Sequence, residues 1–237
     1  MAVQYNPSIV TDGLIMYLDA ANVRSYGGTG ITWADLSSQA NSITLYNGPA
    51  YNTTTTPNIS FDGTDDYGIN NGNTAVQNLM ATTSFSFSFW AKFNATTSNR
   101  VVFGNGDPEF ELISGYQVRV SPNTGILSIY LNDAVLFALR IQSYSGLGGF
   151  VGTWNNFVYT NTTLEGKVYR NGSLLSQNAP ITSDFTVSST EPLFIGMGPF
   201  NTRYTNMNLA VLKIYNKTLS ASEVLSNYNA LRGRFGL

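Results

Sequence analysis

Alternation of apolar and polar side chains dominates this sequence. Its strongest stretch runs from Phe85 to Phe93, where aromatic residues recur at alternate positions and Ser86 and Ser88 lie between them. A two-residue period predicts a central strand that turns one bulky aromatic face inward. Weaker runs of the same kind predict further strands at residues 13–18, 59–61, 100–104, 110–113, 116–120, 126–131, 135–141, 154–160, 166–170 and 193–196.

Turn-forming residues separate these runs. Asn171-Gly172 is a favoured two-residue hairpin sequence, and Asn123-Thr124-Gly125 and Asn132-Asp133 are turn sequences of the same kind. Short strands at a spacing of roughly ten residues are typical of two antiparallel sheets packed face to face. Trp33 lies in a long segment rich in Gly, Ser and Asn, where we expect it to fill the core.

The last thirty or so residues change period from strand to helix. Residues 209–216 alternate like a half-buried strand, and Ser220 and Glu223 then have the spacing of a capping box. Gly233 is placed to end the helix in a left-handed turn. Phe235 and Leu237 could pack on the protein's own sheet or on a neighbouring molecule, and we expect the former, since both would otherwise be exposed. The helical face is formed by Val224, Leu225, Tyr228 and Leu231.

The chain is expected to form one domain. No Pro-rich linker, block of charge or internal repeat divides its 237 residues, a length that all-β sandwiches often reach as a single unit. We therefore predict a short N-terminal arm at residues 1–12 and a single β-sandwich domain at residues 13–237.

Composition excludes several functions. Only 11% of the residues are charged, the net charge is -2, and no cluster of Lys or Arg provides a footprint for nucleic acid or an anionic membrane. The absence of Cys and His excludes thiol nucleophiles, zinc fingers and histidine-based acid–base catalysis, so any chemistry would depend on carboxylates. The N-terminus does not resemble a signal peptide and no apolar run is long enough to span a bilayer, so we expect a soluble protein made in the cytoplasm.

Several blocks together resemble one superfamily. They are residues 13–20, 33–36, 61–67, 85–90, 153–158, 168–172 and the closing strand and helix, and they cover almost the whole chain. In order and spacing they resemble the concanavalin A-like lectin/glucanase superfamily, and more narrowly the laminin G-like jelly-roll domains common in bacteriophage virion proteins. The resemblance implies an all-β fold, a two-sheet antiparallel jelly-roll sandwich with one short C-terminal helix. Because this fold hosts lectins, hydrolases, receptor modules and structural domains, it does not fix the activity.

The strongest catalytic candidates are Glu109 and Glu111, which would project from one face of a strand. Retaining glucanases of the superfamily look similar, with a Glu nucleophile and a Glu acid about 5 Å apart on one strand. Here the residue order departs from the family pattern Glu-x-Asp-x-Glu, and Pro108 interrupts the strand. A turn that leads into a polar strand face is the simpler interpretation, and we predict no catalytic residues.

A calcium site is the second candidate, because laminin G-like domains often hold Ca²⁺ with Asp and backbone carbonyl ligands. Asp62, Asp65 and Asp66 are available, with Asp19 expected beside them in the fold. Such an ion takes six to eight oxygen ligands. The alternative is that Asp in a Gly-containing turn caps its own backbone.

Carbohydrate binding is the third candidate. Sugars are held by an exposed aromatic ring on their apolar C–H face, together with amide and carboxylate partners for the hydroxyls. Loops with that composition also occur as ordinary connections in Tyr-rich β proteins. The predicted sugar-binding residues are Asn105, Asp107, Tyr144, Arg203 and Tyr204.

These observations favour a non-enzymatic bacteriophage virion structural protein. It would be a capsid or tail decoration (cement) protein or a fibre-like component, located in the virion and bound to other virion proteins, with a symmetric homo-oligomer such as a trimer compatible with that role. The chain has little before its first strand that could act as the stem of an adhesin. The alternative is a glycan-binding adhesin or receptor-binding module for a host-surface glycan, and the third interpretation is a glycoside hydrolase.

Overall fold

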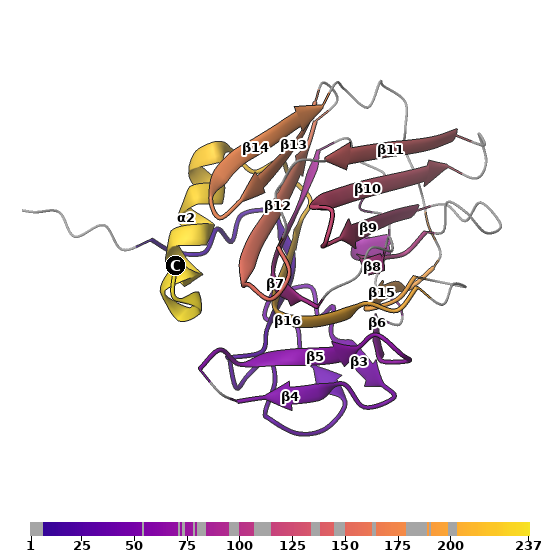
Figure 1. Cartoon of the computed structure of the whole chain (residues 1–237), viewed down its shortest axis with the longest axis vertical. Helices are drawn as coiled ribbons and strands as arrows, with labels where there is room; N and C mark the ends of the chain where they lie inside the picture. The colour runs from indigo at the N-terminus through magenta and orange to yellow at the C-terminus, as the bar shows by residue number, and fades with distance from the viewer. Residues whose placement is uncertain are drawn as a thin grey trace, which may run out of the picture.

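Two antiparallel sheets face each other across a continuous apolar core, and one helix lies at the outer side of the first sheet (Figure 1). This computed structural model describes residues 7–53, 55–70, 72, 74–77, 79, 84–94, 100–106, 115–133, 138–144, 150–162, 165–178, 189, 191–198 and 203–237. The prediction of an all-β sandwich with a short C-terminal helix is confirmed. The predicted strand at 110–113 and the start of the one at 135–141 lie outside the described residues.

Sheet A has the strand order β14-β13-β12-β7-β16-β5-β4, and β1 pairs with one end of β16. β7 therefore lies near the middle of the sheet, as its aromatic alternation predicts. The strands are β1 (Leu14–Asp19), β4 (Ala50–Asn52), β5 (Asn58–Asp62), β7 (Phe85–Phe93), β12 (Asn155–Asn161), β13 (Gly166–Arg170), β14 (Ser173–Asn178) and β16 (Asn206–Tyr215).

Sheet B has the order β11-β10-β9-β8-β15-β6-β3-β2. A short helix, α1 (Thr74–Gln77), lies in the segment between β6 and β7. The described helices include none that is long and apolar enough to cross a membrane. The strands are β2 (Thr32–Trp33), β3 (Ile43–Tyr46), β6 (Tyr67–Asn70), β8 (Arg100–Gly104), β9 (Gly115–Ser121), β10 (Ile126–Asp133), β11 (Ala138–Tyr144) and β15 (Leu193–Ile195).

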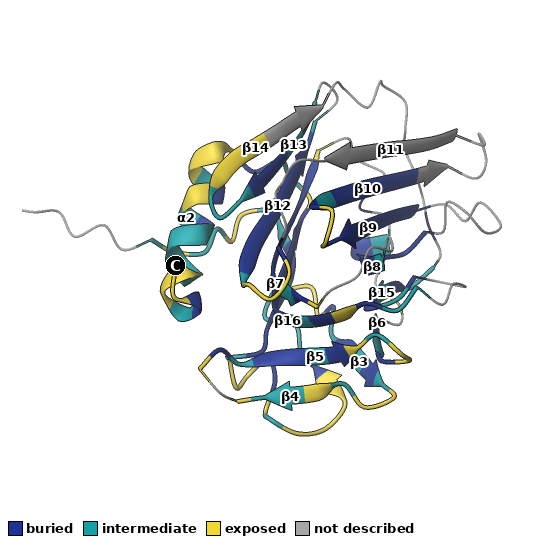
Figure 2. Ribbon diagram, viewed as in Figure 1, coloured by how far each residue is buried: buried dark blue, intermediate teal, exposed yellow. Residues whose placement is uncertain are grey.

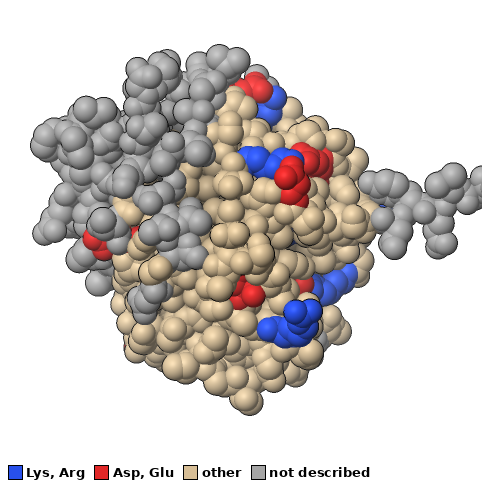
Figure 3. Space-filling view, turned by 180° about the vertical axis from the view of Figure 1, so that it is seen from behind, with Lys and Arg blue, Asp and Glu red and all other residues tan. Residues whose placement is uncertain are grey.

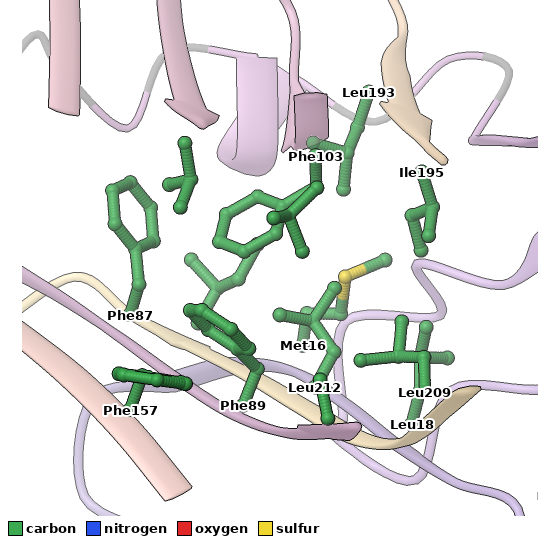
Figure 4. Close-up of a cluster of buried hydrophobic side chains, with 14 of the residues drawn as sticks. Met16, Leu18, Phe87, Phe89, Phe103, Phe157, Leu193, Ile195, Leu209 and Leu212 are labelled. Carbon is green, nitrogen blue, oxygen red and sulfur yellow. The ribbon is translucent and has the colours of Figure 1, made fainter. Parts of the chain in front are cut away.

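The core is formed by the inward faces of both sheets. Phe87 and Phe89 of β7 meet Phe103 of sheet B edge to face, with ring centroids 5.2 and 5.7 Å apart (Figure 4). Edge-to-face pairs place the positive ring edge on the negative ring face, which adds to the gain from apolar burial. Trp33 is fully buried in the same core, as predicted.

The C-terminal helix covers the outer face of sheet A. Helix α2 (Ala221–Leu231) begins at Ser220 with both halves of the predicted capping box, and a 3₁₀ helix, η2 (Arg232–Phe235), continues from its end. Because of this cover, Ser86 and Ser88 are fully buried although they point away from the core. Figure 2 shows the consequence, since the central strands of sheet A are buried almost throughout.

The predicted end of the helix is wrong in detail. Gly233 lies inside η2, and Gly236, with a φ of 72°, takes the left-handed position instead. Phe235 packs on the protein's own sheet as predicted, with its ring 3.9 Å from that of Trp90. Leu237 does not, because 45% of it is exposed.

The described part of the N-terminal arm packs against α2. The backbone N–H of Val10 donates to Oδ1 of Asn227 at 2.9 Å, and the Tyr215 hydroxyl donates to the carbonyl of Val10 at 3.1 Å. Asn227 is itself buried and donates from Nδ2 to the Tyr215 oxygen. The arm, the helix and β16 are thus joined by buried polar contacts.

Candidate ligand-binding face

The outer face of sheet A is occupied by the chain itself. Trp90 projects outward from β7 and stacks with two rings of the C-terminal segment, Phe235 at 3.9 Å and Tyr228 at 5.7 Å. Val158 and Tyr215 are buried in the same way against Val224 of α2. Over these strands the outer face is therefore closed to a ligand.

The outer face of sheet B differs at β3, β6 and β15. In β3 the inward residues Ile43 and Leu45 are buried, whereas Thr44 and Tyr46 point outward and are partly exposed. Tyr67 and Ile69 of β6 alternate in the same way with buried neighbours. Alternation along each strand thus places several apolar side chains on a surface that is open to solvent.

Cross-strand register gathers these side chains. Thr44, Ile69 and Phe194 pair in one row across β3, β6 and β15. Tyr46 and Tyr67 pair at the end of the β3–β6 ladder, and their rings stack with centroids 5.0 Å apart and planes at 11°. All five residues are partly exposed. We call Tyr46, Tyr67, Ile69 and Phe194 the aromatic strip.

An acidic turn borders the aromatic strip. Residues 62–66 connect β5 of sheet A to β6 of sheet B, so the turn runs directly into Tyr67. Asn47, which follows Tyr46, donates from Nδ2 to the backbone carbonyl of Asp65 at 2.8 Å. The strip and the turn are therefore parts of one surface.

The carboxylates of the turn have unequal environments. Oδ1 of Asp62 accepts from the backbone N–H of Thr64 at 2.7 Å, and this bond lowers the pKa of the Asp62 carboxyl. Oδ2 of Asp66 accepts from the N–H of Asp62 at 2.9 Å. Desolvation by burial nevertheless raises the pKa of Asp66, and the negative charges of Asp62 and Asp65 add to that rise. Backbone capping, the alternative interpretation of these residues, is therefore present in the structure.

The same three carboxylates could supply part of a cation site. Asp62, Asp65 and Asp66 each offer an oxygen, and these oxygens lie within 4.8 Å of one another. Three ligands are fewer than the six to eight that Ca²⁺ takes, so backbone carbonyls or water would have to complete the shell. The prediction of calcium at these residues fits the geometry in part and stays a prediction.

Asp19 does not join the acidic turn. Its Oδ1 accepts from Nη1 of Arg234 at 2.8 Å, its Oδ2 accepts from the Tyr17 hydroxyl at 3.1 Å, and its side chain is 7% exposed. The expected place of Asp19 beside Asp62 is wrong, because Asp19 pairs with Val211 of β16 whereas Asp62 pairs with Asn206, five positions away on that strand.

The predicted sugar-binding residues are dispersed. Asn105 is fully buried, with Nδ2 donating to the carbonyl of Gln77 at 3.0 Å and Oδ1 accepting from the N–H of Tyr116 at 3.0 Å. It holds α1 and β9 together and is not presented to a ligand. Arg203 and Tyr204 are partly exposed and lie near Val101, at the other end of β8 from Asn105.

The structure describes the remaining predicted site residues only in part or not at all. The backbone of Tyr144 ends β11 opposite Leu127, and its side chain is outside the description. Asp107, Glu109 and Glu111 all lie outside the described residues, so the sugar-binding prediction for Asp107 and the hydrolase candidates stay untested. The aromatic strip itself was not predicted. Its signal was present in the short alternating runs 43–46 and 67–70.

Helix α2 thus covers the outer face of sheet A, while several apolar side chains on the outer face of sheet B are partly exposed. Residues 62–225, well over half of the chain, match the family described as the concanavalin A-like lectin/glucanases superfamily. The chain belongs to this superfamily. No curated protein matches the sequence.

Solved structures with the same fold include binding domains of a botulinum neurotoxin and of Paraclostridial Mosquitocidal Protein 1. The botulinum neurotoxin serotype D binding domain aligns with a TM-score of 0.68 and 17% identity, covering 93% of this chain and 52% of that one. The binding domain of Paraclostridial Mosquitocidal Protein 1 aligns with a TM-score of 0.72 and 15% identity, covering 92% and 52%. The chain thus spans about half the length of these structures, and at such identities the likeness shows the fold alone. None of these matches supports the narrower prediction of a bacteriophage virion protein.

Proposed function

We propose that this chain is a non-enzymatic binding module that recognises a carbohydrate with the aromatic strip on the outer face of sheet B. The observation that carries the proposal is the partial exposure of Tyr46, Tyr67, Ile69 and Phe194 on a sheet face that α2 leaves open. Partly exposed rings grouped on one rigid surface lose little conformational freedom when they bind.

The chemistry of the strip suits a sugar. The C–H face of a pyranose ring is apolar and packs on aromatic carbon, while its hydroxyls need donors and acceptors close by. The exposed Asn47 amide, the Thr44 hydroxyl and the exposed carboxylates of Asp62 and Asp65 lie around the strip. These groups could orient a sugar that the rings hold.

The relatives support binding rather than catalysis. Solved structures that share the fold include binding and receptor-binding domains of botulinum neurotoxins and the binding domain of Paraclostridial Mosquitocidal Protein 1. Within the acidic turn, one carboxylate oxygen each of Asp62 and Asp66 accepts from backbone N–H groups, as expected of a structural turn. A place in a virion, virion proteins as partners and a homo-oligomer stay predictions.

Alanine substitution in the tyrosine pair tests the proposal. Tyr46→Ala and Tyr67→Ala should each weaken binding at least about tenfold, or about 1.4 kcal/mol, to saccharides found with a broad glycan panel. Tyr204→Ala is the matched control, since Tyr204 is also partly exposed and lies in a loop outside the strip.

Binding would be measured by titration calorimetry, with circular dichroism to show that each variant is folded. A wild-type protein that binds no saccharide at high concentration would refute the proposal. So would a tyrosine-pair variant that binds as well as the wild type. Loss of binding in Tyr204→Ala alone would instead favour a sugar site in the loop that contains Arg203 and Tyr204.

A further inference from the structure

We infer that the aromatic strip selects uncharged saccharides and rejects acidic ones, because the acidic turn lies at its edge. This inference rests on the proposed function and specifies its ligand class. The discriminating groups are Asp62 and Asp65, which are both exposed, and the partly desolvated Asp66.

The turn is held close to the rings by covalent and hydrogen-bonded links. Asp66 directly precedes Tyr67, and the Asn47 amide, next to Tyr46, holds the carbonyl of Asp65 at 2.8 Å. The turn is also fixed internally, since Oδ1 of Asp62 accepts from the N–H groups of Thr64 and Asp65 at 2.7 and 3.4 Å. A sugar on the tyrosine pair would therefore lie beside a fixed group of carboxylates.

The negative charge of the turn is not compensated by the ion pairs of the described chain. Those pairs join Arg234 to Asp19, Lys217 to Asp12 and Glu223, and Lys167 to Glu165. The turn therefore keeps a negative potential at the strip at neutral pH.

This potential acts differently on neutral and acidic ligands. A carboxylate or sulfate on the ligand would come within about one Debye length of the turn, roughly 8–10 Å at moderate salt, and would be repelled. A neutral sugar meets no such repulsion, and its hydroxyls can donate to the same carboxylates. Like-charge contact is a known means of rejecting a wrong partner.

Matched saccharide pairs test the inference. Each pair differs only in an acidic group: glucose and glucuronate, galactose and galacturonate, and a lactosyl oligosaccharide with and without sialic acid. Binding is measured by calorimetry with a chelator present, so that no divalent cation offsets the carboxylates. The wild type should bind the neutral member about fivefold more tightly or better, and the difference should shrink as salt rises, because salt screens the repulsion.

Removing the charge should remove the preference. Asp62→Asn/Asp65→Asn keeps acceptor oxygens for the turn while deleting two charges, and should reduce the difference between the neutral and the acidic ligand to less than about twofold. Asp65→Asn alone, which leaves the Asp62 cap in place, guards against a folding defect in the double variant. Asp12→Asn is the matched control, since Asp12 is exposed and pairs with Lys217 near α2.

The outcomes separate the two proposals. Equal binding of neutral and acidic members by the wild type, or a preference that persists in both asparagine variants, overturns the inference and leaves the proposed function intact. Absence of binding to every saccharide overturns the proposed function and this inference with it.

Discussion

Lys213 is a basic residue buried inside the described structure. It points outward from β16 but is fully buried beneath the C-terminal segment, and its Nζ makes no hydrogen bond. It lies 5.7 Å from the centre of the Tyr17 ring. Desolvation lowers the pKa of Lys213 to about 7, while the charge of Asp19 raises that pKa and the charge of Arg234 lowers it. Burial of Lys213 therefore destabilises the folded protein when the amine is protonated.

The lowered pKa of Lys213 predicts that the free energy of unfolding rises with pH. Between the native pKa of about 7 and the unfolded value of 10.5, the unfolded state binds a proton that the native state does not. The free energy of unfolding should therefore increase from pH 7 towards pH 10 and gain nothing from this group below pH 7. Lys213→Met should remove that slope and stabilise the protein at pH 7 by on the order of 3 kcal/mol.

Urea unfolding at several pH values would measure the effect of Lys213. Lys92→Met is the control, because Lys92 is partly exposed on the same side of sheet A and should keep the slope of the wild type. A Lys213→Met protein with an unchanged pH dependence would contradict the assignment.

Single residues differ in how far the sequence predicts their environment. The burial of Trp33 and Phe235 was predictable, since large apolar side chains need cover. Asn105 was misjudged because a buried, fully bonded amide has the same sequence appearance as an exposed one. Tyr46 and Tyr67 are 21 positions apart, and only the register of β3 with β6 makes them a pair.

At the scale of elements, strands with strong alternation were predicted well. The bounds of β7, β8 and β13 match the prediction, because each has a clear apolar face or a defined turn at its end. β14 was missed, since Ser173-Leu174-Leu175-Ser176 does not alternate and becomes a strand only by pairing with β13. A bulge between Leu209 and Val211 also shifts the predicted alternation of β16.

The capping box of α2 gives a prediction at this scale. The Ser220 hydroxyl accepts from the N–H of Glu223 at 3.3 Å, and the Glu223 carboxylate accepts from the N–H of Ser220 at 2.8 Å. Glu223 also pairs with Lys217 at 2.8 Å, a bond that lowers the pKa of its carboxyl. Ser220→Ala should therefore destabilise the protein by about 1 kcal/mol.

Denaturant midpoints of Ser220→Ala and Ser220→Thr would test the cap. Threonine keeps the hydroxyl and should remain close to the wild type, whereas alanine should not. If both variants unfold with the midpoint of the wild type, α2 is held by packing alone.

At the scale of the whole molecule, the two outer faces have different uses. The outer face of sheet A contributes to stability, because α2 and η2 pack on it and form a buried cluster with Trp90, Val211 and Phe235. Sheet B keeps an open region at β3, β6 and β15. The back view in Figure 3 shows only scattered charges on the described surface, which agrees with a charged content of 11%. Long-range topology decides this division, so no local pattern in the sequence could reveal it.

The acidic turn joins the two sheets, so a cation bound there would stabilise the connection between them. The turn leaves β5 of sheet A at Asp62 and enters β6 of sheet B at Tyr67. Gly63, with a φ of 78°, lies so close to β16 that an added Cβ would be 2.8 Å from the backbone nitrogen of Asn206. An ion held by Asp62, Asp65 and Asp66 would relieve their mutual repulsion and would bind only the folded chain.

Calcium at millimolar concentration should therefore raise the melting temperature by a few degrees at fixed ionic strength, as expected when a ligand binds only the native state. Asp65→Asn should remove the rise, because it deletes an exposed carboxylate and leaves the backbone acceptor for Asn47 in place. Asp12→Asn should keep the rise. Scanning calorimetry with calcium and with chelator would measure both. Equal melting temperatures for the wild type in the two conditions would exclude a calcium site in the acidic turn and leave backbone capping as the role of its carboxylates.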